Sequence, residues 1–133
     1  LPWAPLLRGA WHNLQLWSRE GGRPPQAAPI AVGADHEIVR DGQGNAIGGV
    51  RMPYIEAPLF THTGYLAAGG MGGITGSKRP LAPEALRELY SDNAAYLAHF
   101  DVATDRLLAA RFISEEDATA MKAAARAALP YAP

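Results

Sequence analysis

The sequence predicts a mainly α-helical chain with a long irregular or extended middle segment and at most one short hairpin. Apolar residues recur at helical spacing near both ends, whereas proline and glycine are concentrated in the middle. The 133 residues suit a single unit. We divide it into a helix that packs on a sheet at residues 5–22, an extended wrap-around segment at 23–80 and a helical tail at 81–133.

The first predicted helix carries one apolar stripe. Pro5 suits its first turn, and Gly21-Gly22 ends it. The stripe consists of Leu7, Ala10, Trp11, Leu14 and Trp17. Tryptophans at this spacing are more often core than binding surface, so we expect Trp11 and Trp17 to be buried. We expect the neighbouring His12 to be partly buried.

The tail shows clear helix signals. Pro83 starts a short helix with Leu86, Leu89 and Tyr90 facing inward. Ser91, with Asp92 beside it, can cap the next helix, and Ser114 to Asp117 resembles a capping box. The expected inward faces are Tyr96, Phe100, Ala103, Leu107 and Ala110 on one helix and Ala118, Met121, Ala125 and Leu129 on the other. His99 falls on an outer face.

The stretch from Val50 to Tyr65 is the centre of the chain. Pro53 and Pro58 each remove a backbone donor, so we expect an extended ribbon here, neither helix nor central strand. Few bulky side chains are available, which indicates that the ribbon packs over another surface. Upstream, the turn at 41–42 predicts a short hairpin or loop excursion, and the glycines at 69–76, with Ser77 and Lys78, predict a flexible surface loop.

Several familiar sites are excluded by their spacing. The Asp41, Gln43, Asn45 pattern lacks the later glycine and glutamate of a calcium loop, and Ser77 precedes Lys78 in the wrong order for a P-loop. The chain has no cysteine, no Gly-x-Ser-x-Gly elbow and no metal-type histidine pair. We therefore assign no catalytic residue, metal site or cofactor within this chain.

Charge and hydropathy restrict the partners. The net charge of −1 argues against nucleic acid and anionic membranes. No apolar run approaches the ~18 residues of a membrane span. The sequence gives no compartment. It begins at Leu1 rather than methionine, which is either an expression choice or the sign of a processed product or one piece of a longer polypeptide.

His62 is the candidate functional histidine, because Thr61, Thr63 and Tyr65 surround it in an otherwise apolar ribbon. Buried polar groups need partners. These side chains either tie the ribbon to a neighbouring surface or line a substrate pocket. Asp35 and His36 form a surface turn more readily than a base and its orienting acid. A small enzyme that uses Asp35, His36 or His62 remains a third, weaker alternative.

The central stretch resembles the bacterial alpha/beta hydrolase domain-containing family, whose members are large predicted serine hydrolases. The family pattern runs from Gly-Val/Ile-Arg-x-Pro to Pro-x-x-Thr-Tyr-Thr-Gly-Trp. Here those positions read Gly49-Val50-Arg51-Met52-Pro53 and Pro58-Leu59-Phe60-Thr61-His62-Thr63-Gly64-Tyr65, so that His62 replaces an aromatic residue and Tyr65 a tryptophan. Residues 6–25 and 89–128 resemble the helices on either side of this pattern.

The resemblance implies the C-terminal part of an α/β-hydrolase-type fold that acts on ester or related acyl bonds. The catalytic triad is then expected in an upstream segment or companion chain, and no catalytic residue carries over. His62, Thr63 and Tyr65 are the expected wall of a pocket for a small ester. The alternative is a non-catalytic helical module that binds another protein through Trp11, Trp17 and the ribbon.

Overall fold

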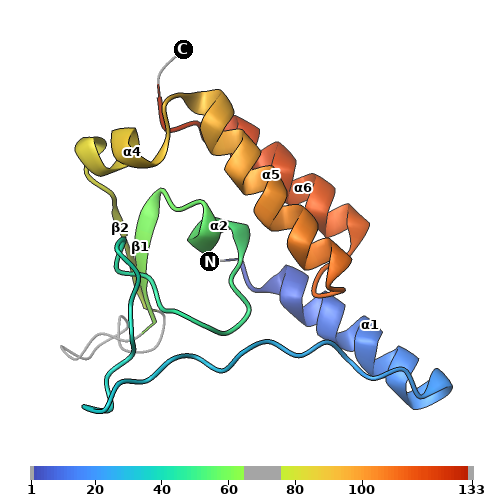
Figure 1. Cartoon of the computed structure of the whole chain (residues 1–133). Coiled ribbons are helices and arrows are strands. Elements are labelled where there is room, and N and C mark those ends of the chain that lie inside the picture. The colour runs from blue at the N-terminus through green and yellow to red at the C-terminus, as the bar shows by residue number, and fades with distance from the viewer. Residues whose placement is uncertain (1, 65–75, 132–133) are drawn as a thin grey trace.

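The computed structural model describes residues 2–64 and 76–131 of the chain. Helices dominate it, with one two-stranded antiparallel sheet (Figure 1). The elements are α1 (Ala4–Glu20), α2 (Pro53–Glu56), β1 (Phe60–Thr63), β2 (Ser77–Pro80), α4 (Pro83–Leu89), α5 (Asn93–Ala109) and α6 (Glu115–Ala127). The mainly helical class with a short hairpin is therefore confirmed.

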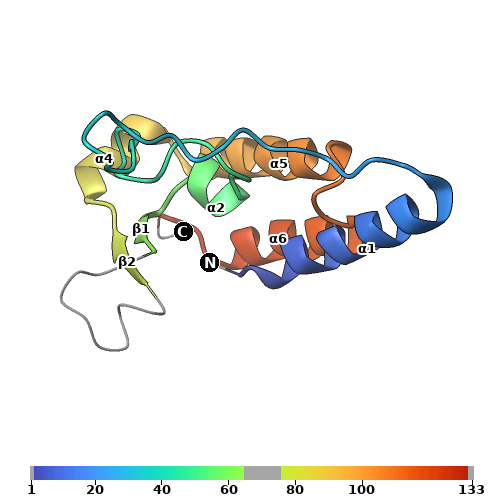
Figure 2. The ribbon, with the colours of Figure 1, turned by 90° about the horizontal axis from the view of Figure 1, so that it is seen from below.

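Helices α5 and α6 form an antiparallel pair, with α1 beside the end where they connect (Figures 1 and 2). The chain after α1 then runs back along the molecule toward the hairpin. The expected cap at Ser114 forms, because its side chain accepts from the Asp117 amide. At α5 the cap is Asp92, which accepts from the Ala95 amide, rather than the neighbouring Ser91 expected from the sequence. Two residues that were expected to face inward do not. Ala110 and Leu129 are exposed near the ends of their helices.

The core lies where α2 packs on the α5–α6 pair. Phe100 is fully buried, and the Tyr54 ring from α2 meets it edge-on with centroids 5.2 Å apart. Tyr90 and Tyr96 extend this cluster, and Met121 adds the buried side of α6. Edge-to-face contacts of this kind add to the stability that apolar burial supplies. The core therefore fixes the central stretch against the helical tail.

Helix α2 corrects the prediction that the stretch from Val50 to Tyr65 contains no helix. Pro53 occupies its first turn, where an amide donor has no helical partner in any case. The amides of Ile55 and Glu56 then donate to the Met52 carbonyl. Pro58 follows and biases Ala57 away from helical geometry, so the helix has a single turn.

Strand β1 pairs with β2 from Phe60 opposite Pro80 to Thr63 opposite Ser77. Ser77 and Lys78 therefore belong to a strand, which corrects the prediction of a loop at these two positions. The other edge of β1 meets the buried side chain of Asn45. That amide donates to the Phe60 carbonyl at 3.2 Å and accepts from the His62 amide at 2.7 Å. Two isolated bridges, Val32 with Ile38 and Arg40 with Ala46, form the loop excursion expected upstream.

Candidate functional site

The hairpin places two of the three candidate pocket residues at one hollow. His62 and Thr63 line a cavity of about 440 Å³, and Tyr65 lies outside the described residues. The other described lining residues are Trp3, Gly64, Gly76, Ser77 and Lys78. His62 lies opposite Lys78 and Thr63 opposite Ser77 in the strand register. Because side chains alternate between the two faces of a sheet, these neighbouring pairs point to opposite faces.

His62 and Lys78 also line a second hollow of about 240 Å³. Its other walls are largely apolar and come from Pro2, Tyr54, Ala57, Leu59, Phe60, Tyr96, Ala124, Ala125 and Ala128. The His62 and Phe60 rings lie 6.2 Å apart between centroids. Strand β1 thus presents a polar hollow and an apolar one that share a histidine and a lysine.

The surroundings of His62 favour its neutral form. Burial lowers the pKa of His62, and the nearby positive charge of Lys78 lowers it further. The Lys78 ammonium lies 4.6 Å from the centroid of the Phe60 ring, in a cation–π contact. The hairpin therefore offers one cation and one neutral imidazole at the same place.

No hydrolase triad forms among the described residues. No carboxylate there hydrogen-bonds to His62, and Ser77 lies opposite Thr63 rather than opposite His62. Asp35 and His36 sit in an exposed turn, where the Asp35 carboxylate accepts from the Glu37 amide. They line neither hollow of the hairpin, so the structure does not bring them together with His62.

Residues 2–64 and 76–131 contain no group of three or more histidines, aspartates or glutamates placed to hold a metal ion. Asp41 instead accepts from the amides of Gln43 and Asn45 and pairs with Arg51. In the described part of the chain, every helix is too short or too polar to cross a bilayer.

The apolar stripe of α1 is exposed, which corrects the expectation of a buried face. Trp11 is 63% exposed and Trp17 is 53% exposed, and Leu7, Leu14 and His12 are exposed as well. The sequence period identifies an apolar face but not what covers it. Here only one side of α1 meets the connection between α5 and α6, at Gly9 and Asn13.

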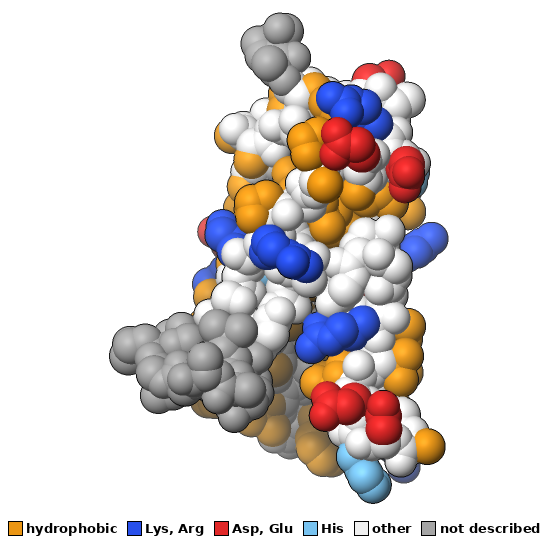
Figure 3. Space-filling view, turned by 90° about the vertical axis from the view of Figure 1, so that its left-hand side faces the viewer, with side chains coloured by type: hydrophobic (Ala, Val, Ile, Leu, Met, Phe, Trp, Pro, Cys, Tyr) orange, Lys and Arg blue, Asp and Glu red, His pale blue; other side chains and the backbone are white. Residues whose placement is uncertain are grey.

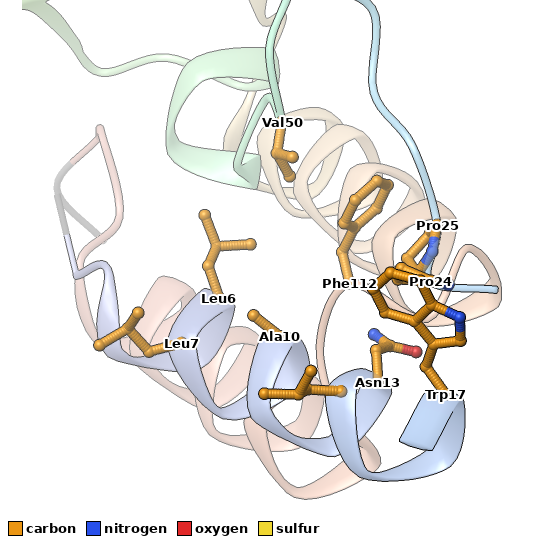
Figure 4. Close-up of a pocket in the computed structure, with 10 residues that line it drawn as sticks. Leu6, Leu7, Ala10, Asn13, Trp17, Pro24, Pro25, Val50 and Phe112 are labelled. Carbon is orange, nitrogen blue, oxygen red and sulfur yellow. The ribbon is translucent and has the colours of Figure 1, made fainter. Parts of the chain in front are cut away.

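An apolar groove of about 460 Å³ follows this face (Figure 4). It is lined by Leu6, Leu7, Ala10, Asn13, Leu14, Trp17, Pro24, Pro25, Val50 and Phe112. The prolines after α1, Val50 before α2 and Phe112 before α6 form the side of the groove opposite the helix. Three separate parts of the chain thus build one apolar surface.

Asn13 is the polar exception in this groove, and sequence reasoning missed it. Its residue is 3% exposed, and its Nδ2 donates to the carbonyls of Gly9 at 2.8 Å and Arg111 at 2.7 Å. These two acceptors fix which end of the amide is nitrogen. Its Oδ1 then has no hydrogen-bond partner among the described residues. The available signal was a polar residue at helical spacing within an apolar stripe.

The chain was also compared with known proteins. The sequence model of the family described as "Alpha/beta hydrolase domain" matches residues 1–123. Comparison with curated proteins finds no match. Comparison with solved structures finds none either. The matched range includes the α1 groove, the hairpin and most of α6.

Proposed function

Because this chain belongs to the alpha/beta hydrolase domain family, we propose that it forms the C-terminal, pocket-lining part of a bacterial serine hydrolase. The substrates are small esters or related acyl compounds. The catalytic triad lies in an upstream segment or a companion chain that docks onto this one. His62, Thr63 and Tyr65 contribute the wall of the substrate pocket.

The exposed face of α1 is the observation that carries this proposal. Burying a large apolar side chain contributes on the order of 1.5–3 kcal/mol, and α1 leaves Leu7, Trp11, Leu14 and Trp17 uncovered. A buried amide oxygen without a partner costs about 1–3 kcal/mol, as at Asn13. A partner that covers the groove would bury Leu7, Leu14 and Trp17 and so recover this apolar contribution. The catalytic segment of the same hydrolase is such a partner.

The serines of this chain support placing the nucleophile elsewhere. Ser18 donates to the Gln15 carbonyl, and Ser114 caps α6 and donates to Asp117. Ser77 lines the hairpin hollow, and Ser91 precedes α5. None sits in a Gly-x-Ser-x-Gly elbow, where a sharp strand-to-helix turn exposes the nucleophile.

The experiment uses protein purified through a tag at the C-terminus of this chain and treated with a fluorophosphonate probe. We expect the label on a serine of a Gly-x-Ser-x-Gly motif, in a polypeptide joined to or co-purifying with residues 1–133. Labelling should abolish hydrolysis of p-nitrophenyl butyrate. Residues 1–133 expressed alone should show no probe-sensitive turnover.

Two results would overturn the proposal. A label on Ser18, Ser77, Ser91 or Ser114 would place the chemistry inside this chain. Absence of any labelled serine in a purified, intact complex would remove the hydrolase role. The same exposed tryptophans would then favour the second candidate function, a non-catalytic helical module that binds another protein through α1.

A further inference from the structure

The face of the hairpin that carries His62 borders the apolar hollow. Phe60 and His62 lie two residues apart on β1, and Lys78 lies opposite His62, so these side chains share one face of the sheet. All three line the hollow of about 240 Å³. Its other walls include Tyr54 from α2, Tyr96 from α5 and three alanines of α6 or its C-terminal end. Separate elements thus surround one small, largely apolar space.

The volume of this hollow suits a single ring. A protein cavity of about 150 Å³ holds a benzene molecule, so 240 Å³ leaves room for a ring with a short substituent. A helix with its side chains is about 10 Å wide and cannot enter such a space. Aromatic rings gain from edge-to-face and offset contacts, and Tyr54, Phe60 and Tyr96 provide three aromatic walls. The lining therefore favours an aryl group.

Tyr96 supplies an unused hydrogen-bonding group to the hollow. The residue is 2% exposed, and its hydroxyl forms no hydrogen bond with a described residue. Among the described residues only Asn13 has a fully enclosed side-chain atom without a partner, so the Tyr96 hydroxyl still borders open space. The hollow is an open space that Tyr96 lines. A ligand oxygen placed there would give this hydroxyl the partner that a buried polar group needs.

The lining favours a neutral ligand. Burial raises the pKa of Tyr96 to about 12 and also raises the pKa of Tyr54, so both hydroxyls are protonated near pH 7. Burial lowers the pKa of His62, which favours the neutral imidazole. Lys78 is exposed, and its ammonium lies 4.6 Å from the centroid of the Phe60 ring. Several Lys and Arg side chains lie across the middle of the face that carries the hairpin (Figure 3), so positive charge is at the surface.

We propose that this hollow is an aryl subsite, which binds the ring of a neutral phenol or aryl ester and hydrogen-bonds its oxygen through Tyr96. Its part in turnover rests on the proposed function, because water cleaves the acyl–oxygen bond of an aryl ester to give a carboxylic acid and a phenol. The binding itself does not depend on the triad. The ring then contacts His62 and not Thr63, because these two side chains point to opposite faces of the hairpin.

The test is a titration of residues 1–133 with 4-methylphenol, followed by ¹H–¹⁵N NMR at about pH 7. The control ligand is 4-methylcyclohexanol, which has a similar size and the same hydroxyl but no aromatic ring. We expect 4-methylphenol to shift the amide signals of Phe60, Tyr96 and Ala125 saturably. The control ligand should bind about three- to tenfold more weakly, the equivalent of one edge-to-face contact.

Two alanines of α6 provide matched variants. Ala124 and Ala123 are both exposed, but only Ala124 lines the hollow. Leucine is a good helix former at either position, whereas at position 124 it would occupy the space of the ring. We expect Ala124→Leu to weaken 4-methylphenol binding at least tenfold and Ala123→Leu to stay within about twofold. Dispersed spectra will show that each variant is folded.

Tyr96→Phe tests the hydrogen bond separately. The variant keeps the ring and removes the hydroxyl, so it should weaken 4-methylphenol binding about three- to tenfold, the equivalent of one hydrogen bond. Unchanged affinity in this variant would show that Tyr96 does not hold the ligand oxygen and would overturn that part of the proposal.

The aryl subsite is wrong if 4-methylcyclohexanol binds as tightly as 4-methylphenol, if Ala124→Leu and Ala123→Leu weaken binding equally, or if 4-methylphenol gives no saturable shift. These outcomes are separate from those of the serine probe. Binding of 4-methylphenol without a labelled serine would keep the subsite and remove its role in ester hydrolysis. A labelled serine without such binding would keep the hydrolase and overturn the subsite.

Discussion

Arg8 on α1 and Asp117 on α6 form a forked ion pair. The Nε of Arg8 donates to both carboxylate oxygens of Asp117, at 3.1 and 3.2 Å, and a terminal nitrogen of the guanidinium joins them. The Ser114 hydroxyl also donates to Asp117, at 2.8 Å. The hydrogen bonds from Arg8 hold the pKa of Asp117 below its ordinary range. This pair ties α1 to the tail beside the Asn13 contact.

Replacing Asp117 with asparagine should lower the thermal midpoint of the chain. The midpoint of the variant should also change less as the pH is lowered into the acidic range. A carboxylate with a lowered pKa stabilises the fold above its unfolded pKa, which is about 3.9, and loses that effect as pH falls through the folded pKa. Melts followed by circular dichroism should therefore differ most near neutral pH and converge at strongly acidic pH. Asp105→Asn is the control, because Asp105 pairs with Lys122 at an exposed position. A difference that persists unchanged at about pH 2 would contradict this assignment.

Gly9→Ala should destabilise the chain although alanine favours helices. A Cβ at Gly9 would lie 2.0 Å from the Phe112 carbonyl oxygen, so α1 must move away from the α5–α6 connection. Helix propensity gains up to about 1 kcal/mol, whereas overpacking costs about 1–3 kcal/mol. We expect a net loss in chemical denaturation. Gly22→Ala is the control, since a Cβ there has open space. A more stable Gly9→Ala variant would show that α1 is not held closely.

His62 should make the fold sensitive to mild acid. Its pKa is lowered by burial, so between the folded pKa and the ordinary value of about 6.5 the unfolded chain binds more protons. Stability is therefore greatest above about pH 6.5 and declines as pH falls through that window. His62→Gln, which does not titrate, should flatten this part of the profile. Replacing the exposed His36 in the same way should leave the profile unchanged. An identical slope in wild type and His62→Gln would exclude His62 as the source.

Trp17→Glu should prevent docking at the α1 groove without affecting the folding of this chain. Trp17 is largely exposed, so its loss should change the stability of residues 1–133 by less than about 0.5 kcal/mol. If the proposed catalytic segment is a companion chain, the same change should abolish its co-purification with residues 1–133, because a charge would enter the groove. Val102→Glu, at a similarly exposed apolar residue of α5 outside the groove, is the control. If both variants dock normally, the α1 face is not the docking surface.

The tail was predictable because its signals are local. Asp92 and Ser114 cap their helices through side chains within one turn, and Phe100 and Met121 follow the helical period into the core. Pairing of β2 with β1 depends on contacts distant in sequence, so Ser77 and Lys78 appeared to belong to a loop. Helix α2 is hard to predict because a proline such as Pro53 breaks a helix in its interior but is compatible with one at the first turn.

The site was predictable to a smaller extent. His62 and Thr63 could be singled out as polar residues in an apolar ribbon, and both line the hairpin hollow. Lys78 could not, because its position opposite His62 depends on the strand register. The exposure of Trp11 and Trp17 could not be predicted either. The spacing of apolar residues shows which face of a helix is apolar, but it does not show whether another part of the protein covers that face.

The Asn45 amide has a consequence for self-association. An unpaired strand edge is a template for further strands and hence for aggregation. On β1 that edge is closed by Asn45, whose side chain occupies the hydrogen-bonding positions of a third strand. The opposite edge belongs to β2, where Lys78, Arg79 and Pro80 are all exposed, and charge and proline disfavour pairing there. A sheet of only two strands is thereby protected against growth in both directions.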